Sequence, residues 1–160
     1  MPELSEVDLR ILRALQADGR LTNVELAERV GLSPSPCLRR VKQLEARGLI
    51  KGYVALLDRR AIGLGVMAFV EVQVERNSET AAEAFTAALK REGAVVACYA
   101  MTGPYDYLLQ VVTPTLDDYA DFAMQRLLKM PGVKDVRSSF ALEAAKESTA
   151  LPLEHLGRRG

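Results

Sequence analysis

The apolar residues near the N-terminus recur at the spacing of amphipathic helices, and short polar or glycine-containing stretches separate them. A first helix is predicted to begin after an N-cap at Ser5 and to end at Gly19. Its apolar stripe consists of Leu4, Ile11, Leu12 and Leu15. Two more short helices follow, and three helices with such stripes can share one small core.

Only a few residues separate the second and third predicted helices. Thr22 and Glu25 form a capping box, in which each side chain binds a backbone N–H that the first helical turn leaves free. Gly31 ends this helix, and Ser33 and Pro34 begin the next one as its N-cap and first residue. Two helices this close must cross at a steep angle. The pattern therefore predicts a helix-turn-helix, a motif used most often to read DNA.

The third helix has a basic outer face. Its apolar side is predicted to consist of Cys37, Leu38, Val41 and Leu44. Arginine can bind guanine O6 and N7, glutamine can bind adenine N6 and N7, and cations neutralise phosphate, so the outer face fits a major groove. The alternative is an ordinary solvated helix face, but the capped helix and turn that precede it favour DNA binding.

The candidate DNA-binding residues extend over and just beyond the motif from Asn23 to Lys42. They are Asn23, Ser33, Ser35, Arg39, Arg40, Lys42, Gln43 and Arg47. We expect three of them to face base edges, namely Ser35, Arg39 and Gln43. Three others are expected to meet phosphate, namely Arg40, Lys42 and Arg47.

The hydrophobic pattern changes from helical to alternating in the second part of the chain. Residues 66–75 alternate, which predicts a half-buried strand. A helix capped by Ser78, strands at 94–102 and 107–113, a helix capped by Thr115 and a strand at 133–142 are predicted to follow. This βαββαβ order folds into a four-stranded antiparallel sheet with both helices on one face. The other face requires cover, which predicts dimerisation.

The predicted fold class is α+β. We divide the chain into a winged-helix-like, three-helix DNA-binding domain at 1–52, a linker strand and hinge at 53–65, a ferredoxin-like domain at 66–145 and a C-terminal tail at 146–160. Residues 49–57 read as extended chain that forms a small hairpin or a linker strand. His155, the sole histidine, is expected to be solvated in the polar tail.

Charge is distributed unevenly, although the 160-residue chain has a net charge of zero. Residues 1–60 contain 11 basic and 8 acidic side chains, a balance of +3, whereas residues 61–160 contain 10 and 13, a balance of −3. The positively charged part contains the predicted helix-turn-helix, so charge and motif agree on where DNA, an anionic polymer, would bind. A balance of +3 is mild and favours an assembly that multiplies DNA contacts.

The remaining composition excludes several classes of protein. No apolar stretch approaches the ~18 residues of a membrane span, and the N-terminus lacks the order of a signal peptide. Cys37 and Cys98 both fall within predicted regular elements and have no metal-binding or catalytic spacing. Reduced thiols fit a cytoplasmic protein. We therefore expect no metal, no cofactor and no membrane partner.

Several segments together resemble the Lrp/AsnC family, the feast/famine transcription regulators of bacteria and archaea. They are Asp18–Tyr53, the TGPYDYLL turn at 102–109, the PGV at 131–133 and the SSFALEAAKESTALPL ending. The LSPSPC start of the third helix and the GxxDYLL turn are the most specific. The resemblance covers nearly the whole chain.

The resemblance implies a homodimer that assembles further into tetramers or octamers, with an amino acid or related metabolite bound between dimers. The residues that match its effector site are Ala100, Gly103, Asp106, Leu116, Ser139, Phe140 and Ala141. A glycine and an aspartate in a hairpin turn most often serve the turn itself, and the resemblance is what favours ligand contact at Asp106. Departures from the leucine-responding member at Ala100, Pro104 and Ser139 argue against leucine specificity.

Three functions compete. We expect a sequence-specific, effector-responsive transcription regulator that binds double-stranded DNA. The alternative is an architectural protein that wraps DNA with little dependence on sequence or effector. Some haem-pathway decarboxylases are similar to this family, but proton transfer favours a histidine in the pocket. His155 lies in the tail, so an enzyme is not expected.

Overall fold

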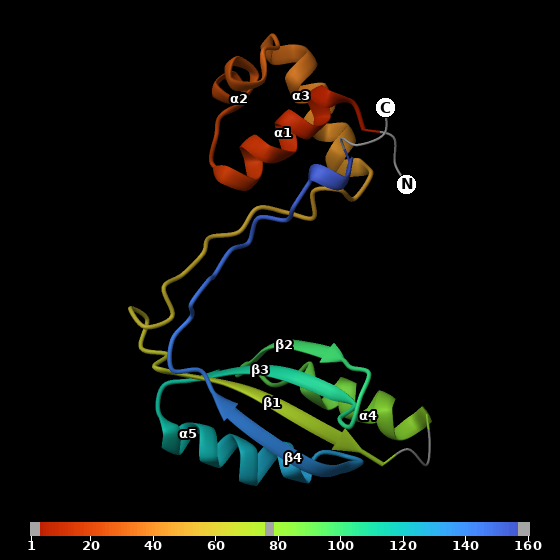
Figure 1. The fold of residues 1–160 in the computed structure, drawn as a ribbon, viewed down its shortest axis with the longest axis vertical. Coiled ribbons are helices and arrows are strands. Elements are labelled where there is room, and N and C mark those ends of the chain that lie inside the picture. Colours follow the sequence, from red (N-terminus) through yellow and green to blue (C-terminus); the bar gives the residue numbers. More distant parts are fainter. Residues whose placement is uncertain (1–3, 76–78, 157–160) are drawn as a thin grey trace. The chain divides into compact units, whose positions relative to one another are not determined.

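The computed structural model describes residues 4–75 and 79–156, which form two compact units (Figure 1). The first unit comprises Met1–Leu56 together with Lys146–Gly160, and the second comprises Leu57–Ala145. The chain therefore passes from the first unit to the second and returns to the first at its C-terminal end.

Three helices build the first unit: α1 (Glu6–Ala17), α2 (Asn23–Val30) and α3 (Pro34–Ala46). The predicted capping box on α2 is present, and Gly31 ends the helix in the left-handed conformation at φ 72°. Such a φ is open to glycine at little cost. The buried side chains of the shared core are Ile11, Leu12, Ala14, Leu26, Ala27, Val30, Cys37 and Leu44.

Two local expectations differ in this unit. Leu38 was predicted on the apolar side of α3, but its side chain is 43% exposed and lies on the outer face. The predicted hairpin or linker strand at 49–57 is also wrong, because no strand forms there. Leu49 and Ile50 pack against the helical core instead, and the Tyr53 hydroxyl donates to Glu45 Oε1 at 3.0 Å.

The second unit has the βαββαβ order. Its elements are β1 (Val66–Val74), α4 (Glu79–Leu89), β2 (Val95–Ala100), β3 (Tyr107–Thr113), α5 (Leu116–Asp121) and β4 (Val133–Phe140). All strand pairs are antiparallel, in the order β2-β3-β1-β4 (Figure 1). After α5 the chain continues as a π-helix, Phe122–Arg126, and a 3-10 turn, Leu127–Lys129. Ser78, the predicted cap of α4, lies outside the described residues.

Both helices of the second unit cover one face of the sheet. The alternating residues of β1 that face them are Ala68, Val70, Val72 and Val74, and all are buried. They share a core with Phe85 of α4 and Phe122. By the alternation of strand side chains, Phe69 and Tyr99 lie on the opposite face, where they are 40% and 58% exposed.

Candidate DNA-binding and effector sites

The outer face of α3 presents a mixed polar and apolar surface. A shallow open depression along it is lined by Ser35, Leu38, Arg39, Lys42, Gln43 and Ala46. These positions lie three and four residues apart, so one helix face displays all of them. A helix that enters a groove presents such a row of donors to base edges and phosphates. Leu38 adds an exposed apolar side chain to this face.

The turn between α2 and α3 is fixed by Asn23, whose Nδ2 donates to the Pro34 carbonyl at 2.8 Å. The Asn23 Oδ1 atom is buried without a partner among the described residues. Ser33 occupies the N-cap position of α3 with extended backbone, but its side chain makes no capping hydrogen bond. Asn23 thus connects the two helices of the motif through a side-chain contact that spacing alone does not reveal.

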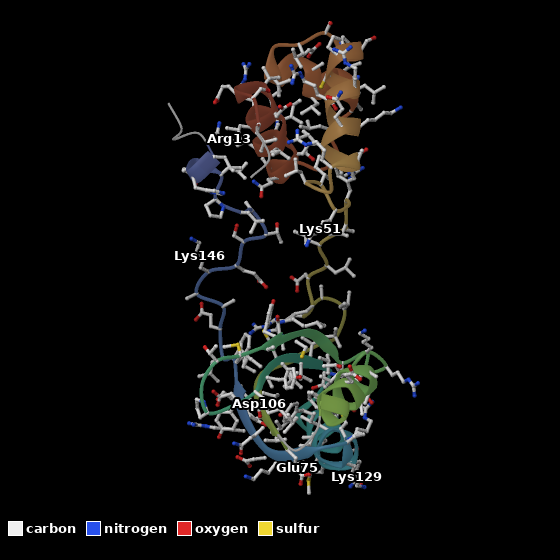
Figure 2. The ribbon with its side chains drawn as sticks, turned by 90° about the vertical axis from the view of Figure 1, so that its right-hand side faces the viewer. Arg13, Lys51, Glu75, Asp106, Lys129 and Lys146 are labelled. Carbon is white, nitrogen blue, oxygen red and sulfur yellow. The ribbon has the colours of Figure 1, made fainter. Side chains whose placement is uncertain are left out.

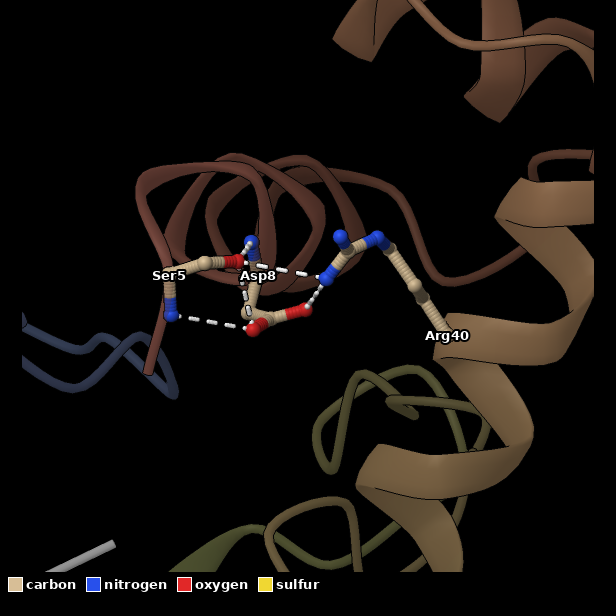
Figure 3. A network of polar contacts seen from close by, with 3 residues as sticks. All are labelled: Ser5, Asp8 and Arg40. Atoms are coloured by element: carbon tan, nitrogen blue, oxygen red, sulfur yellow. Dashed lines mark hydrogen bonds and ion pairs between the residues drawn. The ribbon is translucent and has the colours of Figure 1, made fainter. Parts of the chain in front are cut away.

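A polar network joins α3 to α1 (Figure 3). Arg40 Nη1 donates to Asp8 Oδ1 at 2.9 Å and to Ser5 Oγ at 3.3 Å. The other carboxylate oxygen, Asp8 Oδ2, accepts from the Ser5 backbone N–H at 3.0 Å and from the Ser5 hydroxyl at 2.6 Å. Asp8 therefore serves both the capping box of α1 and the contact with α3.

The electrostatics of this network favour an ionised Asp8. Burial raises the pKa of the Asp8 carboxyl, but the hydrogen bonds from Ser5 and the contact with Arg40 together place it below its ordinary value of 3.8. Arg40 was expected to point outward to phosphate, and the structure gives its guanidinium an intramolecular partner. Its side chain is 34% exposed, against 12% for Asp8.

The glycine-containing turn of the second unit lies between β2 and β3. Gly103 adopts φ 130°, a conformation that side chains disfavour. Asp106 Oδ2 accepts from the N–H of Val74, the last residue of β1, at 2.9 Å. The Asp106 N–H donates to the Val72 carbonyl at 3.0 Å. Part of the role of Asp106 is thus to fasten the turn to the sheet.

The other candidate effector residues lie farther along the sheet. Phe140 packs edge-on against Tyr119, with ring centroids 4.9 Å apart, and the Ala141 N–H donates to the Met67 carbonyl at 2.9 Å. Tyr119 is buried, which raises the pKa of its hydroxyl, and this hydroxyl hydrogen-bonds Ser138. Leu116, the first residue of α5, is 56% exposed.

The candidate effector residues of one chain form two groups. Ala100 pairs with Tyr107, which pairs with Val72, whereas Phe140 pairs with Ala68. Val72 and Ala68 are four residues apart on β1, a separation of about 13 Å at ~3.3 Å per residue. A single small amino acid does not span that distance. One protomer therefore does not bring all seven residues into one pocket.

Sequence models of two known domains match this chain. Residues 4–51 match a winged helix-turn-helix DNA-binding domain, and residues 67–151 match the Lrp/AsnC ligand binding domain. The leucine-responsive regulatory protein of Salmonella typhimurium is 40% identical over 152 residues, which cover 95% of this chain and 93% of that protein.

The chain belongs to the Lrp/AsnC family.

Solved structures of similar proteins agree with this Lrp/AsnC fold. A transcriptional regulator from Neisseria meningitidis, crystallised as a complex with L-Met, is 47% identical and superposes with a TM-score of 0.92 over 96% of this chain and 99% of that one. An AsnC family regulator from Agrobacterium tumefaciens is 38% identical, with a TM-score of 0.90 over 95% and 99% of the two chains. The protein is accordingly a transcription regulator with a DNA-binding unit and a ligand-binding unit.

Three features of this Lrp/AsnC chain were not found from the sequence. They are the exposure of Leu38, the Asp8–Arg40 contact and the two hydrogen bonds between Gln16 of α1 and Leu151 near the C-terminus. The exposure of Leu38 could have been predicted from a helical wheel of α3, because positions 35, 38, 39 and 42 share one face. The other two join residues 32 and 135 positions apart, and no local pattern indicates them.

No helix in the described ranges is long and apolar enough for a membrane span.

Proposed function

We propose that this Lrp/AsnC regulator reads its operator with the outer face of α3, as a dimer whose DNA binding responds to a small amino acid. The observation that supports the DNA-binding surface is the row of exposed donors on α3. Ser35, Arg39 and Gln43 face base edges, and Lys42 and Arg47 meet phosphate. Ser33, whose side chain makes no capping hydrogen bond, contacts the DNA backbone, and Asn23 holds the turn between the two helices in place.

The test of DNA reading is a comparison of operator DNA with random DNA at one stated salt concentration. A sequence-specific regulator binds its operator at least about 10³-fold more tightly. The competing function, architectural wrapping of DNA, gives nearly equal affinities. Equal affinities would therefore replace the first proposal by the second.

We propose an amino acid with an apolar side chain as the effector. The N. meningitidis relative was crystallised with L-Met, and the S. typhimurium relative is named for its response to leucine. An amino acid has an ammonium and a carboxylate that both require partners once they leave water. The Asp106 carboxylate suits the ammonium, and backbone N–H groups near Gly103 suit the carboxylate. The side chain of the bound amino acid contacts residues that different protomers contribute from the two groups. They are Ala100, Leu116, Ser139, Phe140 and Ala141.

The two-group arrangement supports a site between dimers, because one protomer supplies only part of it. The exposed apolar sheet face around Phe69 and Tyr99 supports the dimer itself, with tetramers or octamers above it. On the same face, Arg137 Nε lies 3.8 Å from Glu71 Oε2, so these two charged side chains form an ion pair with each other. Calorimetric titration with the twenty amino acids, beginning with L-Met, tests the effector. The absence of any heat of binding would refute an amino-acid effector.

We also propose that the protein acts in the cytoplasm without catalytic activity or a cofactor. Both cysteines are free thiols, and burial raises the pKa of Cys37. Reduced cysteines suit that compartment.

A further inference from the structure

The C-terminal tail binds α1 through a single carboxamide. Gln16 Nε2 donates to the Leu151 carbonyl at 3.1 Å, and Gln16 Oε1 accepts from the Leu151 N–H at 2.6 Å. One side chain thus satisfies both polar backbone groups of a residue 135 positions away. Glutamine can do so because its amide offers a donor and an acceptor side by side.

An apolar anchor follows two residues later. Leu153 packs against the core of the three-helix unit, and the short helix Glu154–Leu156 closes with a hydrogen bond from the Leu156 N–H to the Leu153 carbonyl at 3.1 Å. Chain ends are ordinarily poorly ordered unless they are tied down. Here a paired hydrogen bond to Gln16 and the packed Leu153 fasten residues 151–153 to the three-helix unit.

The start of the same segment is fastened to the second unit. The Ala141 N–H donates to the Met67 carbonyl at 2.9 Å, and Arg60 Nη2 donates to the Leu142 carbonyl at 3.4 Å. Between the two anchors the chain, which includes Lys146, is exposed and without regular structure (Figure 2). The ligand-binding unit is therefore connected to the DNA-binding unit twice, once before β1 and once after β4.

We propose that the Gln16 face of α1 is a docking site for the chain's own tail, and that the docked tail is a second tether on the DNA-binding unit. A unit on one flexible linker samples many orientations, and a second connection removes part of that freedom. A restrained unit loses less entropy when it meets DNA. The tail is thus an intramolecular ligand whose release loosens the DNA-binding unit.

Docking is tested by hydrogen exchange of the full-length protein, with and without Gln16→Glu. Glutamate keeps the size of glutamine and the acceptor for the Leu151 N–H, but it loses the donor and places a second oxygen against the Leu151 carbonyl. We expect the Leu151 amide to exchange about fivefold faster, the loss of about one net hydrogen bond. Arg13→Ala on the same helix and Lys146→Ala in the tail are matched controls that leave exchange unchanged. Identical exchange in Gln16→Glu and the parent would overturn the docking site.

The tether is tested by time-resolved fluorescence anisotropy of the DNA-binding unit. A dye is attached through Glu28→Cys, an exposed position on α2, in a Cys98→Ser background; Cys37 is fully buried and stays unlabelled. Gln16→Glu and Leu153→Ser should each reduce the slow component of the decay, because the unit then reorients about one linker. Leu153→Ser risks misfolding because it removes an apolar contact with the core. Gln16→Glu replaces a partly exposed polar side chain, so it tests the tether without that risk. Faster exchange at Leu151 with an unchanged decay would overturn the tether.

Discussion

Replacement of Asp8 by Asn perturbs the contact between α1 and the recognition helix α3 with little change of shape. Asp8 is 8% exposed and binds Ser5 and Arg40 through its two oxygens. A hydrogen bond to a charged group contributes roughly 1.5–3 kcal/mol, and the exposure of Arg40 reduces this through solvent screening. We therefore expect Asp8→Asn to lower the free energy of unfolding by about 1–2 kcal/mol. In a small domain that corresponds to roughly 5–10 °C in Tm.

The same variant has a pH signature. The pKa of Asp8 lies below its ordinary value of 3.8, so its stabilising effect is fully present above that value and is lost as the pH falls through the folded-state pKa. Thermal unfolding of parent and Asp8→Asn should differ by a constant amount near neutral pH and converge below pH 3.8. A difference that persists unchanged into acid would refute an ionised Asp8 as its source.

Operator affinity separates two roles of Arg40. A positioning role through Asp8 predicts that Asp8→Asn and Arg40→Ala weaken operator binding similarly and that the double variant loses no more than the larger single loss. The slope of log affinity against log salt then stays unchanged. A phosphate contact instead predicts that Arg40→Ala flattens that slope by about 0.9. Lys42→Ala, on the outer face, is the control that should flatten it. A flattened slope in Arg40→Ala with unchanged affinity in Asp8→Asn would refute the positioning role.

Three further predictions follow from the proposed sites. Arg39→Ala should cost roughly 1–3 kcal/mol on the operator and relax its specificity, measured by titration of operator and mutated sites; an unchanged operator affinity would contradict the docking of α3. Asp106→Asn keeps an acceptor for the Val74 N–H but loses the charge, so calorimetry should detect weaker amino-acid binding while the thermal stability stays near that of the parent. Phe69→Glu places a charge on the exposed sheet face and should shift sedimentation towards the monomer, and a parent that sediments as a monomer at micromolar concentration would remove the dimer altogether.

The local elements followed from the sequence because their determinants are local. Thr22 and Glu25 are three residues apart, and both bonds of the capping box form within one helical turn. The alternation at 66–75 predicted a half-buried strand, and Ala68, Val70, Val72 and Val74 of β1 are buried on one face, since successive strand residues point to opposite faces. The prediction that Leu38 lies on the apolar side of α3 was wrong for a different reason. Its apolar character suggested the core, but its angular position on α3 places it outside.

The sequence by itself determined five helices, four strands, their order and the basic character of α3, because spacing, capping and alternation act over a few residues. Only the tertiary structure decided that Arg40 turns back to Asp8, that the candidate effector residues divide into two groups, and that Gln16 binds Leu151. These contacts depend on where the packing of whole helices and strands places distant side chains. A hydrophobic pattern specifies which face is buried, but the polar partner that a side chain meets there is chosen by the packed fold.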